Sequence, residues 1–117
     1  MRRRWLAYTV VTNSARANTS PYATIRTAKA APGAASEIAS RIEKTFAPTI
    51  SGLPGFIGYY GVAAAEDTFA TISLFTNQAS AEESNRKASE WVKQNLAGLV
   101  LTPLQFVTGE VLVNKAA

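Results

Sequence analysis

The sequence predicts an α+β fold in which strands and helices follow the order β-α-β-β-α-β. Three observations indicate this order. Short β-like runs are separated by glycine and proline turns, longer segments repeat apolar residues every three or four positions, and one tight reversal joins neighbouring strands. No apolar run approaches the roughly 20 residues that a membrane span needs, so we expect a globular domain with no membrane partner.

The first half of the predicted domain is a strand followed by a helix. Residues 22–29 form a β-like run, which a Pro-Gly pair ends. A helix is expected over residues 34–49, because apolar side chains recur on one face at four-residue spacing: Ile38, Ile42 and Phe46. Residues 52–55, Gly-Leu-Pro-Gly, then form a turn.

A hairpin follows this turn. Residues 56–65 are expected to form a strand, Glu66 and Asp67 a two-residue reversal, and residues 68–76 the antiparallel partner. This pairing places Tyr59 opposite Leu74.

A second helix and a last strand complete the domain. Asn77 or Ser80 caps the helix, which is expected to run to about Leu99. Residues 104–114, after Pro103, form the last strand. The resulting order is that of the ferredoxin-like split β-α-β unit.

The first 20 residues differ from the rest. A basic start is followed by a short apolar run and by Ala15-Arg16-Ala17, a pattern typical of a short export signal. The alternatives are a flexible or loosely docked extension, or a start codon placed too far upstream. We therefore expect an extension over residues 1–20 and a domain over residues 21–115, in the cytoplasm, with export as the alternative.

The composition narrows the kinds of site that the chain can build. It has no cysteine and no histidine, so thiolate and imidazole metal ligands and the commonest general base are missing. We expect no metal site and no cofactor. The net charge is +4, but four of the twelve basic residues lie in the first 16 positions and the other eight balance the eight acidic residues. This neutral body disfavours an RNA-binding domain of the same strand order, so we expect no nucleic-acid partner.

Alternation along the predicted strands makes both faces of the sheet apolar. Tyr59, Gly61, Ile72 and Leu74 are expected to face the helices. The opposite face is expected to carry five large side chains: Phe56, Tyr60, Val62, Phe69 and Phe75. Two helices on one side of a sheet cannot cover its other side, which leaves on the order of several hundred Å² of apolar surface. The simplest cover is a second copy of the chain, packed sheet against sheet as a homodimer.

These segments also resemble a known family. The run Pro54-Gly-Phe-Ile-Gly-Tyr59, the strand of residues 69–77 and the helix opening Gln-Ala-Ser-Ala-Glu-Glu are similar to the antibiotic biosynthesis monooxygenase (ABM) family of dimeric α/β-barrel proteins. The resemblance covers residues 22–114 and implies a ligand pocket between the sheet and the helices. Many relatives carry a histidine where this chain has Ser84 and a tryptophan where it has Phe75. The missing histidine counts against a haem-degrading role.

The resemblance implies a cofactor-independent monooxygenase that oxidises an aromatic or quinol-type small molecule with dioxygen. In such a reaction the substrate loses a proton and gives an electron to dioxygen, while the protein excludes water, holds the substrate and stabilises an oxyanion. The alternative is a homodimer of the same fold that binds a small molecule, or has a structural role, without catalysis.

Two residues are the catalytic candidates. Asn85 lies in the apolar stripe of the second helix, where it would place an amide donor in the pocket, and Tyr59 is a second donor on the helix-facing side of its strand. Alternatively, the Asn85 amide donates its hydrogen bond to a nearby backbone carbonyl, and Tyr59 is only an aromatic residue of the core.

Five residues are the substrate-binding candidates. Trp91 would wall the pocket or donate its indole N–H, and Arg26 would pair with an anionic substrate if its side chain turns inward. Gly61 would leave room for a ligand, and Ile72 and Leu74 share its face. The alternatives are an interface or lid position for Trp91, a solvated or interface charge for Arg26, and a sheet bend at Gly61.

Overall fold

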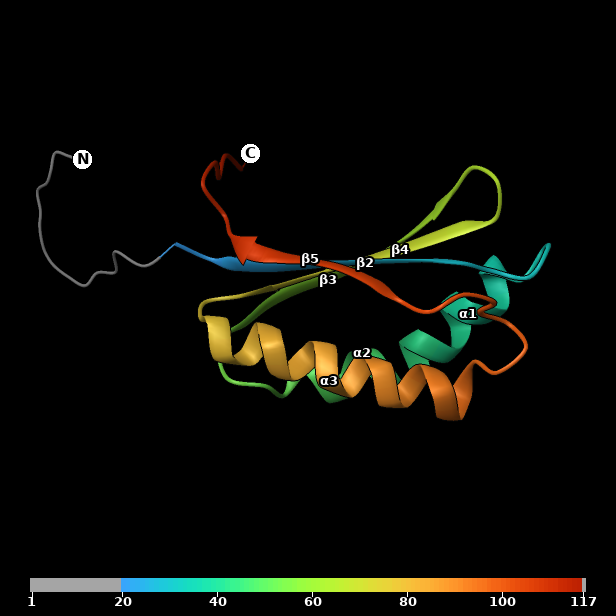
Figure 1. The fold of residues 1–117 in the computed structure, drawn as a ribbon. Helices are drawn as coiled ribbons and strands as arrows, with labels where there is room; N and C mark the ends of the chain where they lie inside the picture. The colour runs from blue at the N-terminus through green and yellow to red at the C-terminus, as the bar shows by residue number, and fades with distance from the viewer. Residues whose placement is uncertain (1–19, 117) are drawn as a thin grey trace, which may run out of the picture.

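A four-stranded antiparallel sheet forms one layer of the domain and the helices form the other (Figure 1). The structure is a computed structural model that describes residues 20–116, so nearly all of the expected extension over residues 1–20 lies outside the described part. The strands follow the order β3-β4-β2-β5 across the sheet: β2 (Tyr22–Lys29), β3 (Phe56–Ala64), β4 (Thr68–Phe75) and β5 (Gln105–Glu110). The predicted ferredoxin-like α+β fold is confirmed.

The helices cover a single face of the sheet (Figure 1). The first predicted helix is a continuous run of three pieces: α1 (Ala35–Arg41), the π-helical turn η1 (Ile42–Phe46) and α2 (Ala47–Ser51). The π-helical turn lies just before Pro48, which has no N–H to continue the regular α-helical bonding. The second helix, α3 (Gln78–Asn95), ends four residues before the predicted Leu99.

The start of α3 is fixed to the turn before β3. Asn77 is the cap, since its side chain accepts a hydrogen bond from the Ser80 N–H at 2.8 Å. The Ser80 hydroxyl donates to the Pro54 carbonyl at 2.7 Å. Gly55 is required here, because its φ is 77° and a Cβ would lie 2.1 Å from the Thr76 hydroxyl.

The predicted pairing of the hairpin is wrong by one residue. Tyr59 pairs with Ser73, because the connection between the paired residues Ala64 and Thr68 is three residues long rather than two. The register shifts again at a bulge between Phe56 and Gly58. A one-residue slip turns every side chain of one strand to the opposite face.

The slip reverses the expected faces of β4. Phe69 and Phe75 are buried beneath the helices, and Phe56 packs edge-on against Phe75 with ring centroids 5.8 Å apart, so these three are not on the open face. Ile72 and Leu74, expected in the pocket, alternate with the buried residues of β4 and thus lie on the open face. Tyr60 and Val62 are exposed on that face, as expected.

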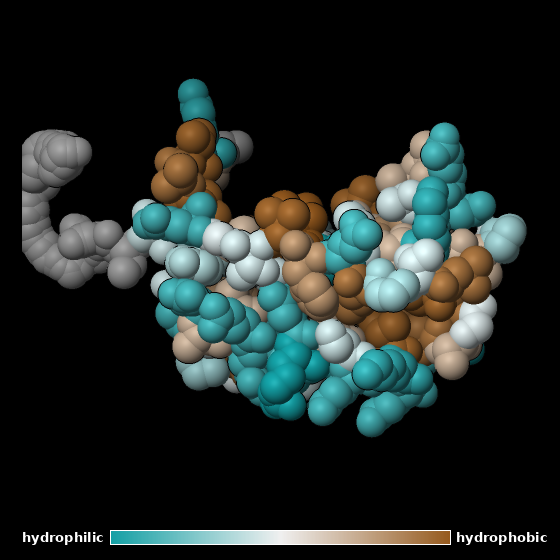
Figure 2. All heavy atoms as spheres, in the orientation of Figure 1, coloured by the Kyte–Doolittle hydropathy of each residue, from teal (hydrophilic) through white to brown (hydrophobic). Residues whose placement is uncertain are grey.

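Polarity is inverted between the two faces of the sheet. The inner face carries buried polar side chains: Thr24, Arg26, Thr71 and Ser73. The open face carries exposed or half-exposed apolar ones: Ile25, Tyr60, Val62, Ile72, Leu74 and Val107. Figure 2 shows apolar atoms on the sheet side of the molecule, opposite the polar outer surface of the helices. A face that contacts solvent is normally polar and a buried face apolar. Both the polar inner face and the apolar open face therefore need an explanation.

The end of the chain departs from the predicted last strand. β5 stops at Glu110, and the Val111 N–H donates to the Pro21 carbonyl at 2.8 Å. Leu112 and Val113 beyond it are exposed. In the described part of the chain, no helix has the length and apolar character required to cross a membrane.

Candidate functional site

A small cavity lies between the inner face of the sheet and the helices. Its volume is about 40 Å³ and its walls are mainly apolar, with side chains from η1, α3 and the strands: Ile42, Phe46, Phe69, Ala88, Trp91 and Leu96. Arg26, Tyr59 and Thr71 contribute the polar part of the wall. An apolar cavity of about 150 Å³ holds a benzene ring, so an aromatic ligand enters this cavity only if part of the wall moves.

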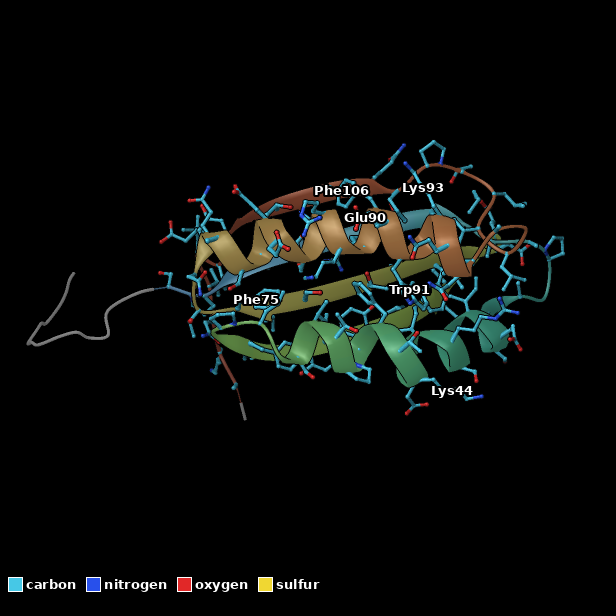
Figure 3. The ribbon with its side chains drawn as sticks, turned by 90° about the horizontal axis from the view of Figure 1, so that it is seen from below. Lys44, Phe75, Glu90, Trp91, Lys93 and Phe106 are labelled. Atoms are coloured by element: carbon cyan, nitrogen blue, oxygen red, sulfur yellow. The ribbon has the colours of Figure 1, made fainter. Side chains whose placement is uncertain are left out.

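One wall of the cavity separates it from an outer groove. Four residues line both spaces: Val92, Leu96, Val100 and Leu104. The groove has a volume of about 520 Å³ and lies between α3 and the segment that leads into β5. In Figure 3, Lys93 and Phe106, which line the groove, lie on the side of α3 away from Trp91. Movement of this shared wall would join the cavity to a space of ligand size.

Arg26 on β2 is the central polar residue of the site. Its side chain points inward and only 3% of the residue is exposed. Nε donates to the side-chain amide oxygen of Asn85 at 3.0 Å. Nη1 donates to the hydroxyls of Ser73 at 3.0 Å and Thr71 at 3.3 Å. Nη2 donates to the Ser84 hydroxyl at 2.8 Å. The guanidinium is therefore held in a fixed position by β4 and α3.

The charge of Arg26 has no acidic partner among residues 20–116. The ion pairs in that range join neighbouring turns of single helices, and their side chains are exposed or half-exposed. Burial lowers the pKa of Arg26 to about 10, an effect that the nearby Tyr59 partly opposes. The Phe46 ring lies 5.9 Å from the guanidinium carbon. At neutral pH the cavity wall therefore carries a buried positive charge.

Tyr59 lies on the helix-facing side of β3, as the sequence predicts. Its ring meets Phe46 edge-on with centroids 5.8 Å apart, and the residue lines the cavity. Burial raises the pKa of the Tyr59 hydroxyl, while Thr71 and Arg26 act in the opposite direction. The hydroxyl therefore stays protonated at neutral pH and can donate a hydrogen bond.

Asn85 is not among the residues that line this cavity, so its amide is not placed there as the sequence led us to expect. Its carbonyl oxygen accepts from Thr24 at 2.8 Å and from Arg26, and its amide nitrogen donates to Thr108 at 2.9 Å. These partners are side chains of β2 and β5, not the backbone carbonyl given as the alternative. Asn85 interrupts the apolar stripe because the sheet beneath it is polar, and it positions Arg26.

Trp91 and Gly61 have mainly packing roles. Trp91 lines the cavity, packs on Phe46 with ring centroids 5.3 Å apart, and donates its indole N–H to Thr45 at 3.0 Å. Figure 3 shows it between α3 and the first helical run. A Cβ at Gly61 would lie 3.3 Å from the Phe69 ring, so Gly61 makes room for Phe69, and it is not among the residues that line the cavity.

Three residues of the site were missed in the sequence: Thr71, Ser73 and Ser84. For Thr71 and Ser73 the available signal was the alternation of polar and apolar side chains along β4, which the wrong register turned outward. Ser84 lies on α3 and was noted only as the position where many relatives carry a histidine. Residues 20–116 contain no group of three or more Asp and Glu side chains able to hold a metal ion.

No family model matches the sequence, and no curated protein sequence matches it either. Solved structures do match the fold. A proposed antibiotic biosynthesis monooxygenase from Nitrosomonas europaea is 16% identical, with a TM-score of 0.65 and coverage of 85% of this chain and 97% of its own. A monooxygenase from the gene ActVA-Orf6 of Streptomyces coelicolor, in complex with nanaomycin D, is 12% identical, with a TM-score of 0.64 and coverage of 85% and 93%.

The haem-degrading protein Rv3592 from Mycobacterium tuberculosis, solved without haem, is 17% identical, with a TM-score of 0.59 and coverage of 86% and 100%. The chain thus has the fold of ABM-type proteins, which supports the resemblance seen in the sequence. Because proteins of different activity share this fold at such low identity, it defines the architecture but leaves the activity open.

Proposed function

We propose that the protein oxidises an aromatic or quinol-type small molecule with dioxygen, without metal or flavin, in the cavity between sheet and helices. The observation that carries this proposal is a mainly apolar cavity whose wall contains one buried cation, Arg26, and the protonated hydroxyl of Tyr59. The fold that the chain shares with a monooxygenase adds support.

The chemistry needs little from the protein beyond electrostatics and exclusion of water. An anthrone-type substrate loses a proton to form an enolate, and the enolate gives one electron to dioxygen. The two radicals combine in a C–O bond, and the resulting peroxide loses water to leave a new carbonyl. One oxygen atom enters the product and the other leaves in water, with the substrate as the only reductant.

The residues of the cavity suit such a reaction. Arg26 would stabilise the anionic substrate and the Tyr59 hydroxyl would donate to its oxygen, where a well-placed donor contributes about 3 kcal/mol. Phe46 and Trp91 would pack on the aromatic rings and keep water out. Asn85 would act indirectly, because it orients Arg26.

Turnover of a substrate panel tests this function. Purified protein is incubated with hydroxyanthrones and hydroquinones under oxygen, after treatment with a chelator, and quinone formation is followed. Tyr59→Phe should slow the reaction about tenfold or more. Tyr60→Phe is the matched control, since Tyr60 lies on the open face. Turnover that depends on added metal or flavin, or that is equal in both variants, would contradict the proposal.

A non-catalytic ligand-binding protein is the second candidate. One observation favours it: apart from the phenol of Tyr59 and the guanidinium of Arg26, the lining found within residues 20–116 has no titratable side chain. No carboxylate or imidazole is therefore at hand to remove a proton from the substrate. Tight binding of the same compounds without quinone formation would favour this reading.

The homodimer is also part of the proposal. The open face carries apolar side chains on all four strands, and they are exposed even on the two edge strands: Tyr60 on β3 is 57% exposed and Val107 on β5 is 69% exposed. A second copy offers the same apolar surface, so two sheets that pack face to face cover both at once. Light scattering should give a particle of twice the chain's 12.5 kDa, and a single chain at micromolar concentration would refute the dimer. A cytoplasmic location belongs to the proposal as well, and fractionation of cells tests it.

A further inference from the structure

The unpaired charge of Arg26 is the feature of the interior that the fold does not explain. Placing a charged group in a protein interior without a counter-charge costs several kcal/mol. All four side-chain partners of Arg26 are neutral: Thr71, Ser73, Ser84 and Asn85. They fix the orientation of the guanidinium but supply no negative charge.

One N–H donor of the Arg26 guanidinium also has no acceptor among residues 20–116. An arginine side chain has five N–H donors. Four of them have protein acceptors among residues 20–116, and one N–H of Nη2 remains. A fixed, preorganised donor on a buried cation is well suited to an anionic oxygen.

The surroundings of Arg26 strengthen its attraction for an anion. The cavity wall beside it is mainly apolar, so an ion pair formed there is screened much less than one at the surface. The nearby Tyr59 hydroxyl is protonated at neutral pH and would donate to the same oxygen rather than repel it. No carboxylate in the described lining competes with the ligand for Arg26.

The geometry points to Arg26 as the counter-ion of the ligand, so that the cavity selects apolar molecules that carry one ionised oxygen, a phenolate, an enolate or a carboxylate. This inference rests on the proposed function only in taking the cavity as the ligand site, and it does not require turnover. The described lining of the cavity has no general base, but Arg26 would help a bound phenol to ionise, because a nearby cation lowers the pKa of the phenol and favours its ionised form.

A chromogenic phenol measures this selectivity directly. The absorbance of 4-nitrophenol reports its ionisation, and its pKa is determined free and bound to the whole protein, with 4-nitroanisole as the ligand that cannot ionise. Wild type should lower the bound pKa by at least about one unit, a tenfold preference for the phenolate. Benzoate against benzyl alcohol tests whether a carboxylate serves equally.

Variants assign the effect to Arg26. Arg26→Met should abolish the pKa shift of the bound phenol, whereas Arg26→Lys, which keeps a charge, should retain part of it. Arg86→Met is the matched control, because Arg86 is exposed and pairs with Glu83 on the outer face of α3. The wild-type titration stands by itself if Arg26→Met fails to fold.

Three results overturn the inference in distinguishable ways. If 4-nitrophenol binds with an unchanged pKa and 4-nitroanisole binds equally well, charge selection is wrong while the ligand site stands. If the pKa shift of bound 4-nitrophenol persists in Arg26→Met, charge selection by Arg26 is likewise wrong and the ligand site likewise stands. If none of these compounds binds to the wild type, the ligand site and the inference fall together.

Discussion

Substitution of Asn85 by aspartate would give Arg26 the counter-ion that it lacks. The carbonyl oxygen of Asn85 lies 3.0 Å from Arg26 Nε, and an aspartate of the same shape would place a carboxylate there. Two unit charges about 4 Å apart attract by about 4 kcal/mol at an effective dielectric constant of about 20. Partial burial of the new carboxylate offsets part of this, so we expect a net gain of about 1–2 kcal/mol in unfolding free energy.

The same change should weaken the binding of anions. With the guanidinium neutralised, the affinity for 4-nitrophenolate should fall about tenfold to a hundredfold, while that for 4-nitroanisole stays the same. Arg26 lowers the pKa of the new carboxyl, so the added stability is present above the pKa of the unfolded chain, about 3.9, and is lost at lower pH.

Urea denaturation and ligand titration measure the two effects on one sample. Gln94→Glu is the matched control, since it makes the same amide-to-carboxylate change at an exposed position of α3. An Asn85→Asp variant that binds phenolate as tightly as wild type would refute the role of Arg26 as the ligand's counter-ion.

Three further predictions follow from the open face, the shared wall and the buried charge. Val107→Glu should give single chains of 12.5 kDa in light scattering, whereas Leu101→Glu, at a residue that is 59% exposed in the outer groove, should not. Leu104→Ala should lower the unfolding free energy by about 2 kcal/mol and speed ligand association in stopped-flow measurements, and an unchanged association rate would rule out entry through this wall. Burial holds the pKa of Arg26 at about 10, below its ordinary value, so above about pH 10 the unfolded chain binds more protons than the folded chain. The unfolding free energy of wild type should therefore rise with pH there, relative to that of Arg26→Met, in denaturation curves.

The sequence was sufficient for the local elements. The strand over residues 22–29 was predicted with its observed bounds, and both helices were found from their apolar spacing. These features depend on contacts between residues close in sequence, such as the Asn77 cap and the stripe that contains Ile38 and Phe46. The inward position of Tyr59 also followed from strand periodicity alone.

The faces of β4 required the tertiary structure. One extra residue in the loop that ends at Asp67 and a bulge after Phe56 shift the pairing, and neither has a strong signal in the sequence. The error moved Phe75 from the core to the open face and Leu74 from the open face into the expected pocket. The open face is nevertheless apolar, as predicted, because apolar residues occupy positions of β4 on both faces of the sheet.

The sequence by itself determined the order of the elements, the neutral charge of the body and the lack of histidine and cysteine chemistry. Only the tertiary structure decided that Arg26 turns inward and that Asn85 meets it, because these residues are 59 positions apart and their contact depends on how α3 lies over the sheet. A buried charge is a property of its surroundings, and those surroundings come from β2, β4 and α3, which meet only in the folded chain.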